Sequence, residues 1–280
     1  MAVYRGMDIG TTKPAPEERR ALRYHLVDLV DPGEEFTVSQ FQAAARVALS
    51  SIAGRGHRAL LVGGTGLYLR AVVDDLELPG RWPAVAAELE EEADGPGGVA
   101  ALHRRLSVLD PTAAARTTDT NRRRVVRALE VTIGSGRPFS SFGPGLDRYP
   151  PSAVHMVGIP FDPASTDVAI ERRFREMLDE GLLDEVRELA RRPGGMSRTA
   201  RQALGYKELL THVEDDVPLD DAVAQAVHRT KLFARRQWAW FRRDPRVHWL
   251  DAASDLEAQL LSSWDAVPAG PARVAVGDWG

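Results

Sequence analysis

The sequence predicts an α/β protein that carries a helical insertion and a helical carboxyl-terminal region, and three observations support this fold class. An apolar run stopped by two glycines, "ALLVGG" at 59–64, precedes the helix-like stretch "TGLYLRAVVDDL", an order typical of a strand, turn and helix in an α/β layer. The chain from Pro79 to about Pro150 is polar and helical in character. After Asp162, apolar residues recur at helical spacing.

Two other stretches are strand candidates, "YHLVDLVDP" at 24–32 and "VHMVGIPFD" at 154–162. Between them, the acidic run "ELEEEADGPGG" and the basic run "NRRRVVRALEV" indicate a helical insertion in the core. The chain from 252 contains Gly and Pro but little apolar periodicity, which predicts a loose tail. The expected division is an α/β core at 1–79, the insertion at 80–150, a core strand with carboxyl-terminal helices at 151–251, and the tail at 252–280.

Two helices are predicted after the last strand. Ile170, Phe174, Met177 and Leu178 follow the spacing of one amphipathic helix. The stretch "LDDAVAQAVHRTKLFARRQWAWFRR" predicts a second, long helix that ends before "DPR". The carboxyl-terminal region is therefore expected to be helical almost throughout.

Composition excludes several classes of function. The net charge of the 280 residues is −4, so an RNA or phosphate site must be a local basic patch and not a property of the whole surface. The chain has no cysteine, which excludes disulfides, thiolate zinc sites and cysteine nucleophiles. No apolar run approaches the ~20 residues of a membrane span, and no secretory signal pattern is present. We therefore expect a cytoplasmic protein without membrane contact.

The turn "GGTGLYL" at 63–69 has two interpretations. A glycine turn that opens a helix exposes unpaired backbone N–H groups at the positive end of the helix dipole, where an anion can bind. A tight strand-to-helix turn with Thr65 as its N-cap explains the same residues equally well. The turn is not a P-loop, because G-x-x-x-x-G-K-[ST] occurs nowhere in the chain.

The stretch "TNRRRVVRALEV" at 120–131 concentrates positive charge. Arg122, Arg123, Arg124 and Arg127 lie within six residues, and on a helix Arg127 shares a face with both Arg123 and Arg124. Most charge runs are solvated faces. Four arginines in a chain of negative net charge nevertheless favour contact with phosphate.

A second basic stretch, "HRTKLFARRQWAWFRRDPR" at 228–246, interleaves cations with aromatic residues. Its only acid, Asp244, stands against seven cations: Arg229, Lys231, Arg235, Arg236, Arg242, Arg243 and Arg246. Such a mixture suits single-stranded RNA, whose bases stack on rings while its phosphates meet cations. The aromatic residues also fit the core side of an amphipathic helix. We expect both, with the aromatic side chains largely packed and several cations facing a ligand.

The stretch "QALGYKELL" at 202–210 places a glycine in a helical context. Gly205 would cost about 1 kcal/mol relative to alanine inside a helix, which indicates a bend or a close approach. Lys207 is either a phosphate ligand or a surface lysine, and the sequence favours the surface. The seven histidines show no metal-binding spacing, and neither H-E-x-x-H nor G-x-S-x-G occurs. These residues indicate a protein that handles RNA or nucleotide phosphates, and they specify no reaction.

Six stretches taken together resemble the bacterial tRNA dimethylallyltransferases. They are "VYRGMDIGTTKP", "HLVDLVDP", "LVGGTGLYLRAV", "RRVVRALEV", "QALGYKEL" and "RTKLFARRQWAWFRR", and they run in order from the first residue to about 251. The resemblance implies transfer of a dimethylallyl group from dimethylallyl diphosphate to N6 of the adenosine 3′-adjacent to the tRNA anticodon. It also implies a fold like the P-loop nucleotide kinases, an insertion that grips the anticodon stem-loop, and Mg²⁺ as the cofactor.

The resemblance also implies site residues. Thr65 matches a family threonine that contacts tRNA, and Gln202 stands where some members carry an arginine near the diphosphate. A family arginine in the insertion is replaced here, at about Ala86. The tRNA contacts implied in the insertion and in the late helix are Arg123, Arg124, Val125, Val126 and Arg127, together with Gln225, Ala226, Val227, His228, Arg229, Thr230 and Lys231.

The family P-loop, its magnesium ligand and the aspartate that serves as general base would lie upstream of residue 1, with Met1 an internal methionine of a longer protein. We therefore expect no certain catalytic residue and no metal ligand within these 280 residues, and no transfer activity from them alone. A missing part of the sheet would also expose apolar surface and lower stability.

Two alternatives stay open alongside a monomeric tRNA-modifying enzyme. One is a non-catalytic RNA-binding remnant of the same family, which keeps the grip on the anticodon loop. The other is a relative of small-molecule nucleotide kinases, but that reading needs a P-loop and gives no reason for two basic stretches.

Overall fold

The computed structural model describes residues 1–143 and 145–267, and the chain divides into two compact units. The core unit comprises residues 1–73 together with the chain from 151 onward. The insertion unit comprises Asp74–Pro150 and contains the predicted insertion at 80–150. Over the described ranges, no helix is both long enough and apolar enough to cross a membrane.

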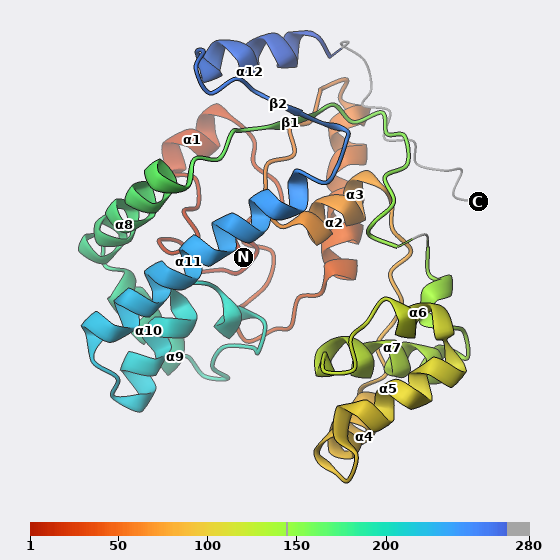
Figure 1. Cartoon of the computed structure of the whole chain (residues 1–280). Helices are drawn as coiled ribbons and strands as arrows, with labels where there is room; N and C mark the ends of the chain where they lie inside the picture. Colours follow the sequence, from red (N-terminus) through yellow and green to blue (C-terminus); the bar gives the residue numbers. More distant parts are fainter. Residues whose placement is uncertain (144, 268–280) are drawn as a thin grey trace. The chain divides into compact units, whose positions relative to one another are not determined.

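The core unit is mainly helical (Figure 1). Its described elements are α1 (Pro16–Ala21), α2 (Val38–Gly54), α3 (Gly66–Val73), β1 (Met156–Gly158), α8 (Pro163–Asp179), α9 (Leu182–Arg191), the 3₁₀ turn η2 (Ala200–Gln202), α10 (Tyr206–Asp215), α11 (Leu219–Phe241), β2 (Val247–Trp249) and α12 (Leu256–Asp265).

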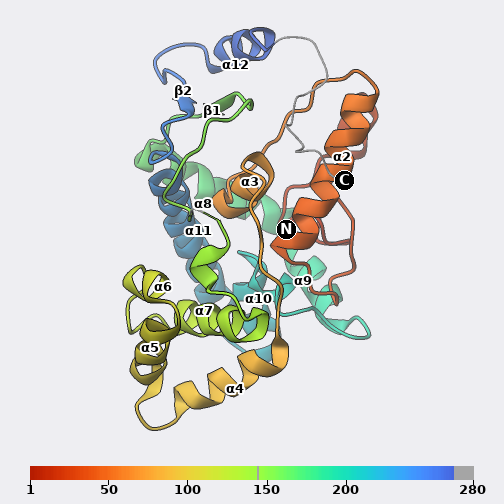
Figure 2. The ribbon, with the colours of Figure 1, turned by 90° about the vertical axis from the view of Figure 1, so that its right-hand side faces the viewer.

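The described sheet has two parallel strands, β1 and β2, which run side by side in Figure 2. Val157 pairs with His248 at the centre of the register. β1 lies inside the predicted strand at 154–162, whereas β2 follows the long helix and was not predicted. The predicted strand at 24–32 forms only an isolated parallel bridge between Tyr4 and Val30. The described fold is therefore mixed and mostly helical, with a small parallel sheet.

The predicted strand at 59–64 is wrong, because this segment forms no strand. Leu60 and Val62 are 71% and 82% exposed, whereas Ala59 and Leu61 are half-buried. No backbone hydrogen bond joins residues 59–64 to another segment among the residues described. A strand exists only through pairing with a neighbour, so an apolar run without a paired neighbour is not a strand.

The core of this unit forms where α9, α10 and α11 pack around the first residues of the chain. Leu182, Val186 and Leu189 recur at i, i+4 and i+7 on α9, and all three are buried. Tyr4 and Tyr206 are fully buried in the same cluster. The "VYRGMDIG" loop thus buries Val3, Tyr4 and Met7 in the core unit, while Arg5 and Asp8 are exposed.

The insertion unit is a small helical bundle with its own core. Its elements are α4 (Pro83–Asp94), α5 (Gly98–Leu109), α6 (Pro111–Ala115), α7 (Arg122–Ser135) and the 3₁₀ turn η1 (Phe139–Ser141). Leu89, Leu106 and Leu129 meet in its buried cluster. Asn121 caps α7 by accepting a hydrogen bond from the Arg124 backbone N–H at 3.2 Å.

Asp110 joins three parts of the insertion unit. Its buried carboxylate accepts hydrogen bonds from the Ala113 N–H at 3.0 Å and from the Ser140 N–H and hydroxyl, both at 2.7 Å. Burial acts to raise the pKa of this carboxyl, but the hydrogen bonds from Ser140 and Ala113 outweigh it, and the pKa lies below its ordinary value.

Asp110→Asn is therefore expected to destabilise the insertion unit by about 2 kcal/mol at pH 7, because an amide NH₂ would face the donors of Ser140. A lowered folded pKa contributes stability above the unfolded pKa of about 3.9, and this stability is lost as pH falls through the folded pKa. Urea unfolding at pH 7 and pH 3 measures the gap between variant and wild type, which should narrow at pH 3. An equal gap at both pH values would contradict this role.

The predicted loose tail at 252–280 is wrong in its first part, which forms α12. Asp255 caps this helix by accepting the Ala258 N–H at 3.1 Å. Arg58 holds its other end by donating to the Trp264 carbonyl at 2.6 Å, with the guanidinium 4.1 Å from the Trp264 ring centroid. The helix was missed because most of its side chains are exposed, so it lacks an apolar stripe. Residues 268–280 lie outside the described residues.

Candidate nucleic-acid interface

The arginines of α7 differ in whether an acid of the protein pairs with them. Arg122 donates to the Glu90 carboxylate at 2.5 Å and also to Asp94. The hydrogen bond to Asp94, followed by the one to Glu90, raises the pKa of Arg122. Arg123 and Arg124 are exposed, and no described acid pairs with either side chain. These two guanidinium groups are the cations that α7 offers to a phosphate.

Arg127 is a structural residue of the insertion unit. Its Nη2 donates to the carbonyls of Pro79 and Gly80, each at 2.9 Å, and its Nη1 lies 2.8 Å from the Glu130 carboxylate. The second oxygen of Glu130 accepts the Trp82 N–H at 2.8 Å. Arg127 therefore fastens the chain before α4 to the side of α7.

Two predicted contact residues of α7 have no side-chain access to a ligand. Val125 is fully buried and Val126 nearly so, and both belong to the core of the insertion unit. The apolar side chains of an amphipathic helix face the core, and its polar side chains face the solvent. The predicted segment 123–127 thus supplies Arg123 and Arg124 as accessible side chains, while its other members hold the bundle together.

The predicted contact segment 225–231 lies in the middle of α11 and also has two sides. Gln225 and His228 are exposed, Val227 is half-buried, and Ala226 is fully buried. The Thr230 hydroxyl donates a hydrogen bond to the Ala226 carbonyl at 2.8 Å.

Three cations of this helix are paired with acids within the protein, whereas Arg236 is exposed and pairs with no acid among the described residues. Lys231 contacts the Glu171 carboxylate at 2.5 Å, and Arg235 contacts Asp167 at 2.8 Å, so both reach across to α8. Arg229 contacts Glu208 of α10 at 3.0 Å. The sequence could not reveal these acids, because they are distant along the chain from the cations they neutralise.

The aromatic residues of α11 pack against the protein, as expected from an amphipathic helix. The Trp238 ring lies 4.5 Å from Trp249 of β2 and 6.0 Å from Phe161, measured between centroids. Such edge and stacked geometries fix the carboxyl end of the helix to the sheet. The ring of Phe233 lies 5.9 Å from the Arg236 guanidinium.

The "GGTG" turn before α3 is shaped by close approach to α11. A Cβ added at Gly64 would clash with the Gln237 amide, and one at Gly66 would clash with the indole of Trp240. Thr65 between them is exposed, and its carbonyl accepts N–H groups of the first turn of α3. These contacts favour the tight-turn interpretation of the glycines, and Thr65 remains accessible as a predicted tRNA contact.

Gln202 is the last residue of η2, and Lys207 lies in the first turn of α10. The Lys207 ammonium donates to the Gln202 side-chain oxygen at 3.0 Å. Gly205 between them has φ of +85°, a conformation that glycine adopts without strain. Gln202 is exposed and available to a ligand, as the prediction requires.

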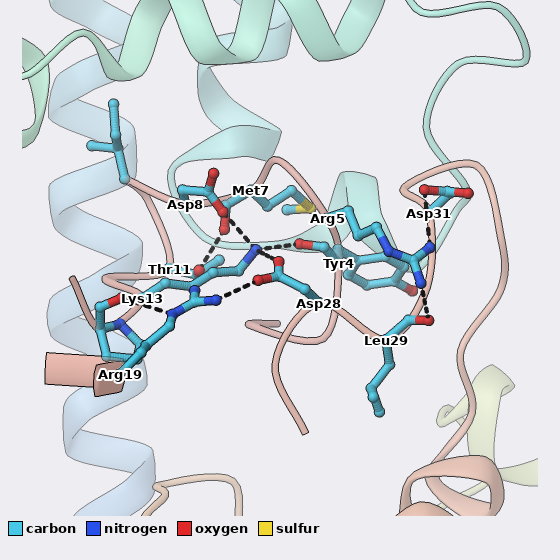
Figure 3. Close-up of polar contacts among 12 residues, drawn as sticks. Tyr4, Arg5, Met7, Asp8, Thr11, Lys13, Arg19, Asp28, Leu29 and Asp31 are labelled. Atoms are coloured by element: carbon cyan, nitrogen blue, oxygen red, sulfur yellow. Dashed lines mark hydrogen bonds and ion pairs between the residues drawn. The ribbon is translucent and has the colours of Figure 1, made fainter. Parts of the chain in front are cut away.

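A cluster around Lys13, which sequence reasoning missed, fixes the first loop of the chain (Figure 3). The ammonium contacts the Tyr4 carbonyl at 2.5 Å, Asp8 at 2.6 Å and Asp28 at 2.5 Å, and the side chain is 2% exposed. Arg19 contacts the other oxygen of Asp28 at 2.8 Å. The cluster ties the "MDIGTTKP" and "HLVDLVDP" stretches together, which explains why a lysine and an aspartate occur in them.

A pocket of about 850 Å³ adjoins this cluster, between the first loop and α8. Five carboxylates line it against three cations: Asp8, Glu18, Asp28, Glu176 and Glu180 against Lys13, Arg19 and Arg173. Two of these cations are already paired with acids. The net acidic lining does not suit a diphosphate.

The described residues contain no ready-made metal cage. Over residues 1–143 and 145–267, no three acidic or histidine side chains come together so that they could hold a metal ion. Magnesium commonly binds through one or two carboxylates together with waters and substrate phosphates, so these residues by themselves define no magnesium site.

The sequence of this chain is similar to those of proteins named for tRNA modification. A family model described as IPP transferase matches residues 2–244. A tRNA dimethylallyltransferase of Bifidobacterium animalis subsp. lactis is 44% identical over 250 residues, which cover 89% of this chain and 71% of that relative. The tRNA dimethylallyltransferase of Streptomyces avermitilis is 46% identical over 259 residues, covering 91% and 81%.

A solved structure is also similar. The crystal structure of the full-length tRNA isopentenylpyrophosphate transferase of Bacillus halodurans matches with a TM-score of 0.65 and 35% identity, covering 97% of this chain and 85% of the other. The likeness therefore extends to the three-dimensional arrangement as well as to the sequence.

Proposed function

The chain belongs to the IPP transferase family, and on this premise we propose that it binds the anticodon stem-loop of tRNA for transfer of a dimethylallyl group. In this reaction N6 of the adenosine beside the anticodon forms a bond to the dimethylallyl carbon. The bond from that carbon to the diphosphate breaks, and a proton leaves N6. The donor is dimethylallyl diphosphate.

The observation that carries tRNA binding is the pair of arginines at the start of α7. Arg123 and Arg124 expose two guanidinium groups without a described acid partner, in a chain whose net charge is −4. Unneutralised cations that stand together on an otherwise acidic protein favour a phosphate backbone as their partner. Exposed Thr65, Gln225 and His228 are further proposed contacts.

The chemical step needs groups that residues 1–280 do not contain. They include no P-loop motif, and the general base of the family is proposed to lie outside them. We therefore propose that this polypeptide supplies tRNA recognition and, by itself, transfers no dimethylallyl group. Gln202 with Lys207 is the proposed diphosphate side of the site.

Two measurements on the 280-residue chain test this function. Fluorescence anisotropy with a labelled anticodon stem-loop should show binding that weakens steeply with salt, and a duplex RNA of equal length without the loop serves as the control. Equal affinity for both RNAs would contradict recognition of the anticodon loop. Incubation of full tRNA with labelled dimethylallyl diphosphate should give no product above background, and measurable turnover would contradict the proposed inactivity.

A further inference from the structure

The carboxylate of Glu185, in the first turn of α9, holds the loop that follows Met7. It accepts the backbone N–H groups of Asp8 and Ile9, each at 2.9 Å. The hydroxyl of Tyr206 donates to the same carboxylate at 2.5 Å. Burial first, and the bond to this carboxylate second, raise the pKa of Tyr206, so the phenol keeps its proton and remains a donor.

Glu208 lies in the first turn of α10, as Tyr206 does, and its carboxylate makes a second connection. Its side chain is only 1% exposed, and one oxygen accepts the Gly205 N–H at 3.0 Å. The other oxygen accepts from Arg229 of α11, also at 3.0 Å. One carboxylate therefore closes the Gly205 turn and ties it to the long helix.

The two connections flank Lys207. Tyr206 and Glu208 are both buried, whereas Lys207 between them is half-buried and reaches Gln202. The backbone of 202–208 is thus fastened on one side to the first loop and on the other side to α11.

We propose that Glu185, Tyr206, Glu208 and Arg229 are positioning residues that set the 202–207 turn for its ligand. In particular, Arg229 acts through Glu208 and does not contact an RNA phosphate. This inference rests on the proposed function, in which that turn is the diphosphate side of a tRNA site.

The burial of Glu208 is the reason to exclude a direct phosphate contact. Arg229 is the only cation that contacts Glu208 among the described residues. The Arg229 side chain is 41% exposed, but if its guanidinium left Glu208 for a phosphate, a carboxylate with 1% exposure would lose its counter-charge, and breaking a buried pair in this way is strongly unfavourable. Arg123 has no such tie and is the natural comparison.

Binding of the anticodon stem-loop to the full 280-residue chain separates the two roles. Arg229→Ala and Glu208→Gln should each leave the salt slope of stem-loop binding unchanged and weaken binding of dimethylallyl diphosphate by about tenfold, and the Arg229→Ala/Glu208→Gln double variant should lose no more than either single one. Arg123→Ala should lower the slope by about 0.7–0.9, as expected for one lost phosphate contact. A lowered slope for Arg229→Ala, with unchanged diphosphate binding by Glu208→Gln, would overturn the inference.

Unfolding measurements keep the inference testable if the chain binds no tRNA, an outcome that would refute the proposed function alone. In urea, Arg229→Ala and Glu208→Gln should each lower the midpoint, and the double variant should match the lower single variant. Additive shifts would show that the pair is not coupled.

Glu185→Gln should also speed amide hydrogen exchange at 8–10 and at 203–206 together, whereas faster exchange at 8–10 alone would show that Tyr206 does not link the two segments. Arg229→Lys, which keeps the charge, should recover part of the midpoint.

Discussion

Replacing Lys13 by methionine is expected to lower the free energy of unfolding of the core unit by about 2–3 kcal/mol. The ammonium has three acceptors within 2.6 Å and a side chain that is 2% exposed. Removing one partner of a buried ion pair costs about 3–5 kcal/mol. The cost is smaller here because Asp8 is mostly exposed and Asp28 keeps its contact with Arg19.

Urea unfolding followed by circular dichroism measures this loss. Lys207→Met is the matched control, because it removes a half-buried lysine whose described partner is the neutral Gln202, and a change of about 0.5 kcal/mol or less is expected. Equal losses in the two variants would show that the Lys13 cluster contributes nothing special to the fold.

The Arg123→Ala/Arg124→Ala double variant is expected to weaken tRNA binding by at least about tenfold at 0.15 M salt. Two phosphate contacts account for about 1.4–1.8 of the slope of log K against log salt, and this part of the slope should disappear. Anisotropy titrations over a range of salt concentrations measure both quantities. Helix α7 should stay folded, because both side chains are exposed and the cap at Asn121 is untouched.

Arg104→Ala/Arg105→Ala is the control for net charge, since it removes two exposed arginines from α5 of the same unit. Its effect on the slope should be small. If the two double variants changed the slope equally, the start of α7 would have no special role in RNA binding. Arg127→Ala, in contrast, should destabilise the insertion unit, because it frees the Pro79 and Gly80 carbonyls.

Periodicity was enough to predict two of the long helices, α8 and α11, but not α2, which has the same length as α8. Helix α11 ends at Phe241, and two residues separate it from "DPR". Strands were harder to predict, because a strand depends on a partner that may lie far away along the chain. Val157 pairs with His248, while the more apolar segment at 59–64 pairs with no strand among the described residues.

Charge patterns predicted where cations gather and could not predict which of them are free. Arg122 and Arg123 are neighbours of the same type, yet one is bound to Glu90 and the other is exposed. The acids that decide this difference come from another helix. In the same way, Glu185 and Glu208 look like ordinary helix residues in the sequence, and only the fold shows the backbone N–H groups they accept from.

The open segment at 59–64 has a practical consequence for every measurement described above. Its amide and carbonyl groups have no backbone partner among residues 1–143 and 145–267, and beside the exposed side chains of Leu60 and Val62 they can template pairing with another polypeptide. Such association grows with protein concentration and does not involve the exposed arginines of α7. Each titration should therefore be repeated at several protein concentrations. Light scattering recorded with it distinguishes weaker RNA binding from aggregation of the protein.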